Sequence, residues 1–169
     1  MHFNNSIAEL AASYNLDASE VRLLKRASKL LDSKLRKPSE HTLLTSPFLV
    51  RNAARMYFAL THAGKEHEVF TVMYLDGAHR LIATVDAFTG TIDAASVYPR
   101  EIVKQALRCN AVAVLFIHNH PTGNPDPSSA DIKITDKLVA ALKLVDIRVL
   151  DHIIIGGLDT VSFAERGLI

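Results

Sequence analysis

The chain has 169 residues, of which 49% are hydrophobic and 22% charged, and this ordinary globular usage excludes wholesale disorder. The single cysteine, Cys109, excludes an internal disulfide and any site built from several thiolates, such as a zinc ribbon. No apolar run reaches the about 18 residues of a membrane span, and the N-terminus lacks a signal-peptide pattern. We therefore expect a cytoplasmic protein with one main domain and no membrane contact.

The net charge of +1 conceals an uneven distribution along the chain. Residues 1–65 carry 10 Lys and Arg against 5 Asp and Glu, whereas residues 66–169 carry 9 against 13. Most of the excess lies in 22–37. This basic segment is consistent with nucleic-acid binding, but it also fits the solvated face of a helix, which is the commoner meaning of such a run.

The first part of the chain predicts a helical segment and a linker. Asp17 and Glu20 have the spacing of a capping box, and the apolar positions that follow predict an amphipathic helix over 18–36. The polar stretch 38–46 predicts a linker. We accordingly divide the chain into an N-terminal segment, 1–45, and a main domain, 46–169.

The main domain mixes helices and strands. A helix is predicted from Pro47 to about His62, and two strands flanking the turn signal Asp76-Gly77 predict a hairpin. The apolar run 111–117 is too short for a lone helix and predicts a strand buried on both faces. The expected order is helix 47–62, strands 68–75 and 80–88, helix 99–109, strand 111–117, loop 121–127, helix 128–145, and strands 147–155 and 160–163. This order predicts an α/β fold.

Two histidines follow the buried strand at a spacing that suits a metal. His118 and His120 are two residues apart, so in extended chain their side chains point the same way. They lie where open α/β sheets place their ligands, at the carboxyl end of a strand. Two imidazoles suit zinc, although the same donors also serve manganese and iron.

A third ligand is available in the next helix. Asp131 falls in its first turn, and Ser128 stands at its entrance. With Asp131 the site would hold two histidines and one carboxylate and would leave a position open for water. The pattern Ser128-x-x-Asp131 is equally an N-capping signature, so both interpretations stand at this point.

These residues match a known motif. The arrangement His-x-His-x7-Ser-x2-Asp, formed here by residues 118–131, resembles the JAMM signature of JAB/MPN+ metalloproteases. More narrowly, HNHPTGNPDPSSADIKIT, with FTGTIDAASVYPREIVKQAL before it and DIRVLDHIIIGG after it, is similar to the bacterial RadC family. The resemblance covers roughly 45–169. It implies a mixed β-sheet flanked by helices, in the cytidine-deaminase-like JAB/MPN architecture.

The resemblance also implies the roles of individual residues. One zinc ion per chain would be held by His118, His120 and Asp131, with water in the fourth position. Glu68, in the segment HEVFTVMYLDG, would be the general base, and Ser128 would donate to the oxyanion of the tetrahedral intermediate. The expected activity is hydrolysis of an amide or isopeptide bond in a peptide substrate. Spacing alone would instead make Glu68 an exposed charge at a strand edge.

Longer members of the family carry an N-terminal helix-hairpin-helix unit. Residues 1–40 contain no glycine, so we expect that unit to be missing here or reduced to the helix that normally follows it. Asp151 and His152 fall in a predicted core strand, where a hydrogen-bonded polar pair is the ordinary interpretation and support of a metal ligand is the alternative.

Three further function classes compete with the hydrolase. The letters His118-Asn119-His120 suggest an HNH nuclease, but in that motif the residues are spread over a ββα unit rather than consecutive. A zinc deaminase would need a Cys-x-x-Cys pair that the chain lacks. A non-catalytic, metal-containing binding module associated with DNA repair or mobile elements is the alternative that we keep.

Overall fold

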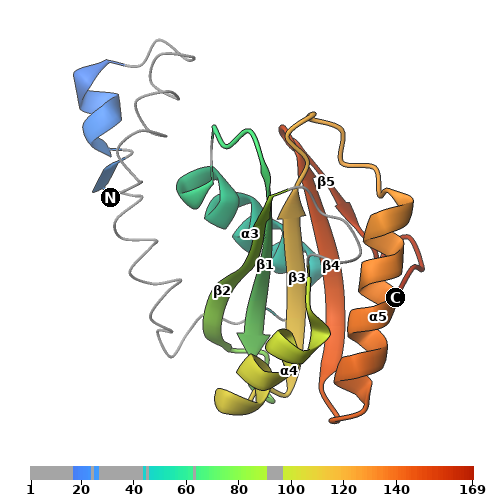
Figure 1. The fold of residues 1–169 in the computed structure, drawn as a ribbon. Coiled ribbons are helices and arrows are strands. Elements are labelled where there is room, and N and C mark those ends of the chain that lie inside the picture. Colours follow the sequence, from blue (N-terminus) through green and yellow to red (C-terminus); the bar gives the residue numbers. More distant parts are fainter. Residues whose placement is uncertain (1–16, 24, 27–43, 45, 63, 91–96) are drawn as a thin grey trace.

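The computed structural model describes residues 17–23, 25–26, 44, 46–62, 64–90 and 97–169. The main domain has the expected order of elements (Figure 1). They are α3 (Pro47–Thr61), β1 (Glu68–Leu75), β2 (Leu81–Gly90), α4 (Pro99–Arg108), β3 (Ala113–Asn119), α5 (Ser129–Lys143), β4 (Arg148–Gly156) and β5 (Asp159–Ser162). The predicted α/β fold is confirmed.

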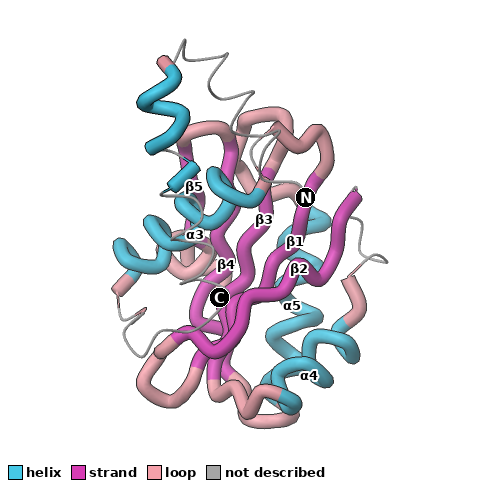
Figure 2. The backbone as a smooth tube through the Cα atoms, turned by 90° about the vertical axis from the view of Figure 1, so that its left-hand side faces the viewer, coloured by secondary structure: helices cyan, strands magenta, loops and turns pink. Residues whose placement is uncertain are grey.

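Within the described residues, five strands form one sheet in the order β2-β1-β3-β4-β5. β3 and β4 are parallel, because α5 crosses between them, and every other neighbouring pair is antiparallel. The sheet is thus mixed, as expected. Figure 2 shows α3 on one side of the sheet and α4 and α5 on the other.

Each face of the sheet has its own apolar core. Leu115 and Ile117 of β3 pack on the α3 side, whereas Val114 and Phe116 pack on the side of α4 and α5. This alternation follows from the period of two in extended chain. His118 continues the second set, so it points toward α5.

The boundaries of β3 correct the sequence prediction. The strand was expected over 111–117, but the ladder with β1 and β4 runs from Ala113 to Asn119. The expected boundaries followed the apolar run, which begins at Ala111 and ends before the polar residue His118. Paired neighbours on both sides instead carry β3 through the first histidine of the motif.

The predicted N-terminal helix is described in part. Residues 18–23 and 25–26 are helical, and the capping box is confirmed: Asp17 Oδ1 accepts from the Glu20 N–H at 3.0 Å, and Glu20 accepts from the Asp17 N–H at 2.8 Å. The remainder of the predicted helix, with most of the basic segment, lies outside the described residues. None of the described helices is long and apolar enough to cross a membrane.

Candidate metal centre

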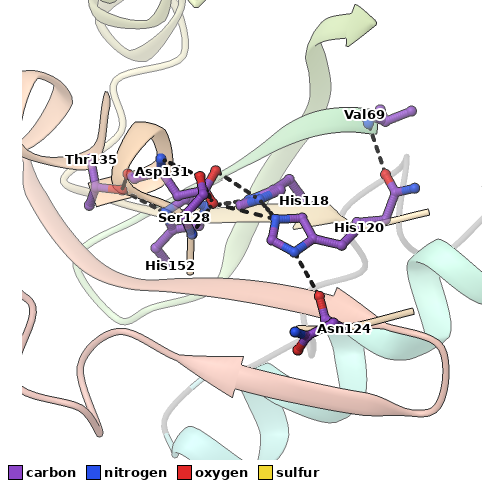
Figure 3. Close-up of polar contacts among 9 residues, drawn as sticks. Val69, His118, His120, Asn124, Ser128, Asp131, Thr135 and His152 are labelled. Atoms are coloured by element: carbon purple, nitrogen blue, oxygen red, sulfur yellow. Dashed lines mark hydrogen bonds and ion pairs between the residues drawn. The ribbon is translucent and has the colours of Figure 1, made fainter. Parts of the chain in front are cut away.

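The carboxyl end of β3 and the amino end of α5 bring three potential metal ligands together (Figure 3). His118 Nε2 lies 2.9 Å from His120 Nε2 and 3.2 Å from Asp131 Oδ1. His120 Nε2 lies 3.4 Å from Asp131 Oδ2. These residues are the ones that the sequence predicted as ligands, and the fold places their donor atoms within one small space.

Each imidazole turns its Nε2 inward because its Nδ1 is held elsewhere. His120 Nδ1 lies 2.8 Å from the backbone carbonyl of Asn124, and since a carbonyl only accepts, Nδ1 carries the proton. His118 Nδ1 lies 2.8 Å from His152 Nε2. The backbone of His120 is anchored as well, because its N–H donates to the Ile155 carbonyl at 2.8 Å.

The loop that orients His120 is packed directly on β4. A Cβ atom at Gly156 would lie 2.5 Å from the Pro125 nitrogen and 2.6 Å from the Gly123 carbonyl oxygen. Only glycine therefore lets the loop approach closely enough to present the Asn124 carbonyl to His120. This requirement could not be read from the sequence, where Gly156 looks like an ordinary end of a strand.

Ser128 caps α5 through the Asp131 carboxylate. Its N–H donates to Asp131 Oδ2 at 2.7 Å and its hydroxyl donates to the same oxygen at 2.6 Å, while the Asp131 N–H donates back to Ser128 Oγ at 3.2 Å. The capping interpretation of the motif is thus confirmed, and it also fixes the carboxylate. The Ser128 hydroxyl could donate a hydrogen bond to a substrate oxyanion only after it has rotated away from Asp131. That role of Ser128 stays a prediction.

Burial and mutual contacts shift the pKa values of all three candidate ligands. Burial of Asp131 acts to raise its pKa, but its contacts with His118 and His120 outweigh burial and hold the pKa well below its ordinary value. Burial lowers the pKa of His118, which is 0% exposed. The hydrogen bond to Asp131 raises the pKa of the more accessible His120. The site therefore combines a carboxylate, a neutral buried imidazole and a second imidazole that binds a cation or a proton.

Glu68 stands at the start of β1, on the site side of the sheet. Phe70, two residues further on, pairs with His118 across the ladder, and their rings stack with centroids 6.1 Å apart. Because side chains alternate, Glu68 is on the same face as Phe70 and His118. The charge of Glu68 acts to raise the pKa of both His118 and His120. Glu68 is therefore on the same side of the sheet as the candidate ligands, and its role as a base stays a prediction.

The three inward donors fit a divalent cation. Two imidazole Nε2 atoms and a carboxylate converge, with separations between 2.9 and 3.4 Å. Zinc bonds of about 2.0–2.1 Å in a tetrahedral arrangement would put ligand atoms about 3.3–3.4 Å apart. Among the described residues, the group of His118, His120 and Asp131 can hold a metal ion.

A surface groove of about 810 Å³, lined largely by residues of α3, is bordered by His120. Its walls combine exposed apolar side chains, including Met56 and Leu158, with the cations Arg55 and Lys65. His118 and Asp131 are buried, whereas the His120 side chain is 12% exposed. A ligand would therefore approach the metal centre from the side of His120.

Of the two interpretations of Asp151 and His152, the structure favours the alternative, in which His152 supports a candidate ligand. Asp151 and His152 do not form a side-chain pair, because successive residues of β4 face opposite sides of the sheet. Asp151 accepts from the hydroxyl of Ser162 at 2.6 Å, whereas His152 contacts His118. The side chain of Asn119, between the two histidines, bonds to the backbone of β1.

Comparison with known proteins gives similarity over most of the chain. The family model of the RadC-like JAB domain matches residues 47–168. A UPF0758 protein of Vibrio cholerae is 49% identical over 150 residues, which cover 89% of this chain and 90% of the relative. A UPF0758 protein of Pseudoalteromonas translucida is 48% identical over 168 residues, covering 99% of this chain and 73% of the relative. UPF0758 protein YeeS of Escherichia coli is 49% identical over 150 residues, covering 89% and 97%.

Proposed function

This chain belongs to the RadC-like JAB domain family, and from this premise we propose that it is a zinc-dependent hydrolase that cleaves an amide or isopeptide bond. The observation that supports this proposal most directly is that one ligand atom each of His118, His120 and Asp131 lies within 4.8 Å of the other two. His118, His120 and Asp131 would hold the zinc. The position of Glu68 on the same face of the sheet supports its assignment as the base.

The chemistry requires one acid–base group besides the metal. Bound zinc would supply Lewis acidity toward the carbonyl of the scissile bond. Glu68 would take a proton from the attacking water, whose oxygen joins the carbonyl carbon, and would pass that proton to the nitrogen as the carbon–nitrogen bond breaks. The products are a carboxylic acid and an amine, which ionise to a carboxylate and an ammonium group at neutral pH, and no oxidant, reductant or second cofactor is needed.

The groove beside His120 supports a peptide as the substrate. It offers apolar contacts from Met56 and Leu158, and it has room for an extended segment of chain. Arg55 and Lys65 contribute positive charge to its lining, which favours acidic side chains or a terminal carboxylate.

The first experiment measures metal content. Wild-type protein and His120→Ala, purified without chelator, are compared by mass spectrometry, with His67→Ala as the matched control because His67 is exposed. We expect about one zinc per chain in the wild type and the control, and little in His120→Ala. Folded wild-type protein that contains no zinc and takes up none would contradict the proposal.

The second experiment tests cleavage. Zinc-loaded wild type and Glu68→Gln are incubated with a peptide library and with isopeptide-linked dipeptides, and new amino termini are detected by mass spectrometry. Glu68→Gln should retain zinc and lose cleavage by about 100-fold or more, the usual contribution of a general base. If the wild type holds zinc but cleaves nothing, the alternative of a non-catalytic binding module associated with DNA repair or mobile elements replaces the hydrolase.

A further inference from the structure

Two buried residues that are not ligands connect to the metal centre through hydrogen bonds. His152 on β4 lies behind His118, with His152 Nε2 2.8 Å from His118 Nδ1. Thr135 on α5 lies behind His152, with Thr135 Oγ1 2.7 Å from His152 Nδ1. His152 is 0% exposed and Thr135 is 1% exposed, so bulk water does not compete for these bonds. Figure 3 shows this row of side chains.

The direction of the bonds is set at Thr135. Its hydroxyl lies 2.6 Å from the backbone carbonyl of Asp131, one turn earlier on α5. A carbonyl oxygen only accepts, and a hydroxyl has a single proton, so that proton is donated to Asp131. Thr135 must therefore accept from His152, which places the His152 proton on Nδ1.

The environment of His152 keeps it neutral. Its ring packs against Phe70, Phe116 and Phe163, with centroids 5.3, 5.8 and 4.6 Å away. A neutral imidazole has one N–H, so with the proton on Nδ1 the Nε2 atom must accept.

His118 is consequently held in one tautomer. His152 Nε2 can only accept, so His118 Nδ1 carries a proton and donates it. In a neutral His118 this leaves Nε2 without a proton, facing His120 and Asp131. The opposite tautomer would point an N–H into the centre and would prevent His118 from binding a metal.

We propose that Thr135 and His152 are positioning residues that fix the tautomer and the ring orientation of His118 so that its bare Nε2 is presented to a divalent metal. The inference rests on the proposed function, because it concerns the same centre. The row of hydrogen bonds starts at the backbone of one ligand, Asp131, and ends at the ring of another, His118. It thereby couples the position of α5 to the imidazole on β3.

The test uses the full chain and replaces Thr135 by Val, which keeps the shape and removes the hydroxyl. In this variant the Nδ1 proton of His152 has no acceptor, so the tautomer of His152 with its proton on Nε2 becomes more favourable. His152 Nε2 then donates to His118 Nδ1, and the proton of a neutral His118 must lie on Nε2. We expect zinc affinity, measured by competition with a chelator, to fall by about 10- to 100-fold. Thr135→Ser, which restores the hydroxyl, should bind zinc within about threefold of the wild type.

A matched control separates this effect from general loss of stability. Thr71 is also fully buried and also donates its hydroxyl, but to Asp86, which lies outside the metal centre. Thr71→Val should leave zinc affinity unchanged. If Thr135→Val does not fold, His152→Phe serves as the second variant, because it fits among the surrounding phenylalanines and removes the acceptor of His118.

Nitrogen NMR of the imidazoles in the metal-free protein gives a readout that is independent of metal and of activity. The wild type should show His118 protonated at Nδ1, and Thr135→Val should show it protonated at Nε2. A folded Thr135→Val with unchanged zinc affinity and an unchanged tautomer would overturn the inference. Failure of the proposed function is distinct: the wild type would bind no zinc or cleave no substrate, while the tautomers would still be decided by NMR.

Discussion

The side chain of Asn119 extends the β1–β3 ladder beyond its last backbone pair by bonding to Val69. Asn119 Oδ1 accepts from the Val69 N–H at 2.8 Å, and Asn119 Nδ2 donates to the His67 carbonyl at 3.2 Å. These two backbone groups flank Glu68. The residue between the two histidines of the motif therefore attaches the backbone of the proposed base to the strand that carries the ligands.

We predict that Asn119→Ala loosens Glu68 without emptying the metal centre. The Val69 N–H would lose its partner in a partly buried position, and the free energy of unfolding should drop by about 1–3 kcal/mol. Zinc stoichiometry should remain as in the wild type, while turnover falls. Urea denaturation and metal analysis of the same preparation measure both quantities. Unchanged stability would show that the bond contributes nothing.

We predict that Gly156→Ala weakens zinc binding from outside the ligand set. The added methyl group would overlap the backbone of Gly123 and Pro125, so the loop must move and withdraw the Asn124 carbonyl from His120. Zinc affinity should drop by about 10-fold or more, as for the loss of other groups that orient ligands. Gly77→Ala is the control, because a Cβ there meets nothing within 4 Å. Equal affinities of the two variants would contradict the prediction.

We predict that zinc affinity decreases as the pH falls below about 7. Hydrogen bonding to Asp131 raises the pKa of His120 above 6.5, so in the metal-free protein His120 takes up a proton that zinc must displace. Titration calorimetry at pH 6.5 in two buffers of different ionisation enthalpy should detect proton release, and at pH 8.5 the release should be much smaller. Identical zinc affinity at pH 6 and pH 8 would be inconsistent with this account.

A fourth prediction concerns a polar cluster on the α3 side of the sheet. Asp86 Oδ1 accepts from the hydroxyls of Tyr57 at 3.2 Å and Thr71 at 2.8 Å, and it lies 3.2 Å from His62 Nε2. Burial acts to raise the pKa of Asp86, but these bonds, led by that of His62, lower it below 3.8. At pH 7, Asp86→Ala should lower the free energy of unfolding by about 1–3 kcal/mol, and Asp86→Asn by less because its amide oxygen still accepts.

The pH dependence of this effect has a definite sign. The folded-state pKa of Asp86 lies below its unfolded value, so the stabilisation is present above 3.8 and is lost as the pH falls through the folded pKa. The difference in stability between wild type and Asp86→Ala should therefore shrink in acid. Chemical denaturation at pH 7 and pH 3.5 measures it, and a difference that widens in acid would contradict the assignment.

The local pattern of the sequence determined most of the elements and the ligand set. Alternation in extended chain put His118 and His120 on one side, and the capping signature at Ser128 placed Asp131 in the first turn of α5. The hairpin of β1 and β2 followed from β-branched residues around Asp76-Gly77. These features depend on residues only a few positions apart, so periodicity and turn chemistry suffice to predict them.

Only the tertiary structure decided how the ligands are held. His152 reaches His118 because the register of the parallel pair aligns Phe116 with His152, and because α5 packs Thr135 behind it. The hydrogen bond from Asn119 to the His67 carbonyl and the close packing of the loop 123–125 on Gly156 likewise join segments that are far apart in the chain. A single sequence records neither strand register nor the packing distance between helix and sheet. Hydrogen bonds between such segments require the strand register and the packing distance to be correct to within a fraction of an ångström. They can therefore be identified only in the folded structure.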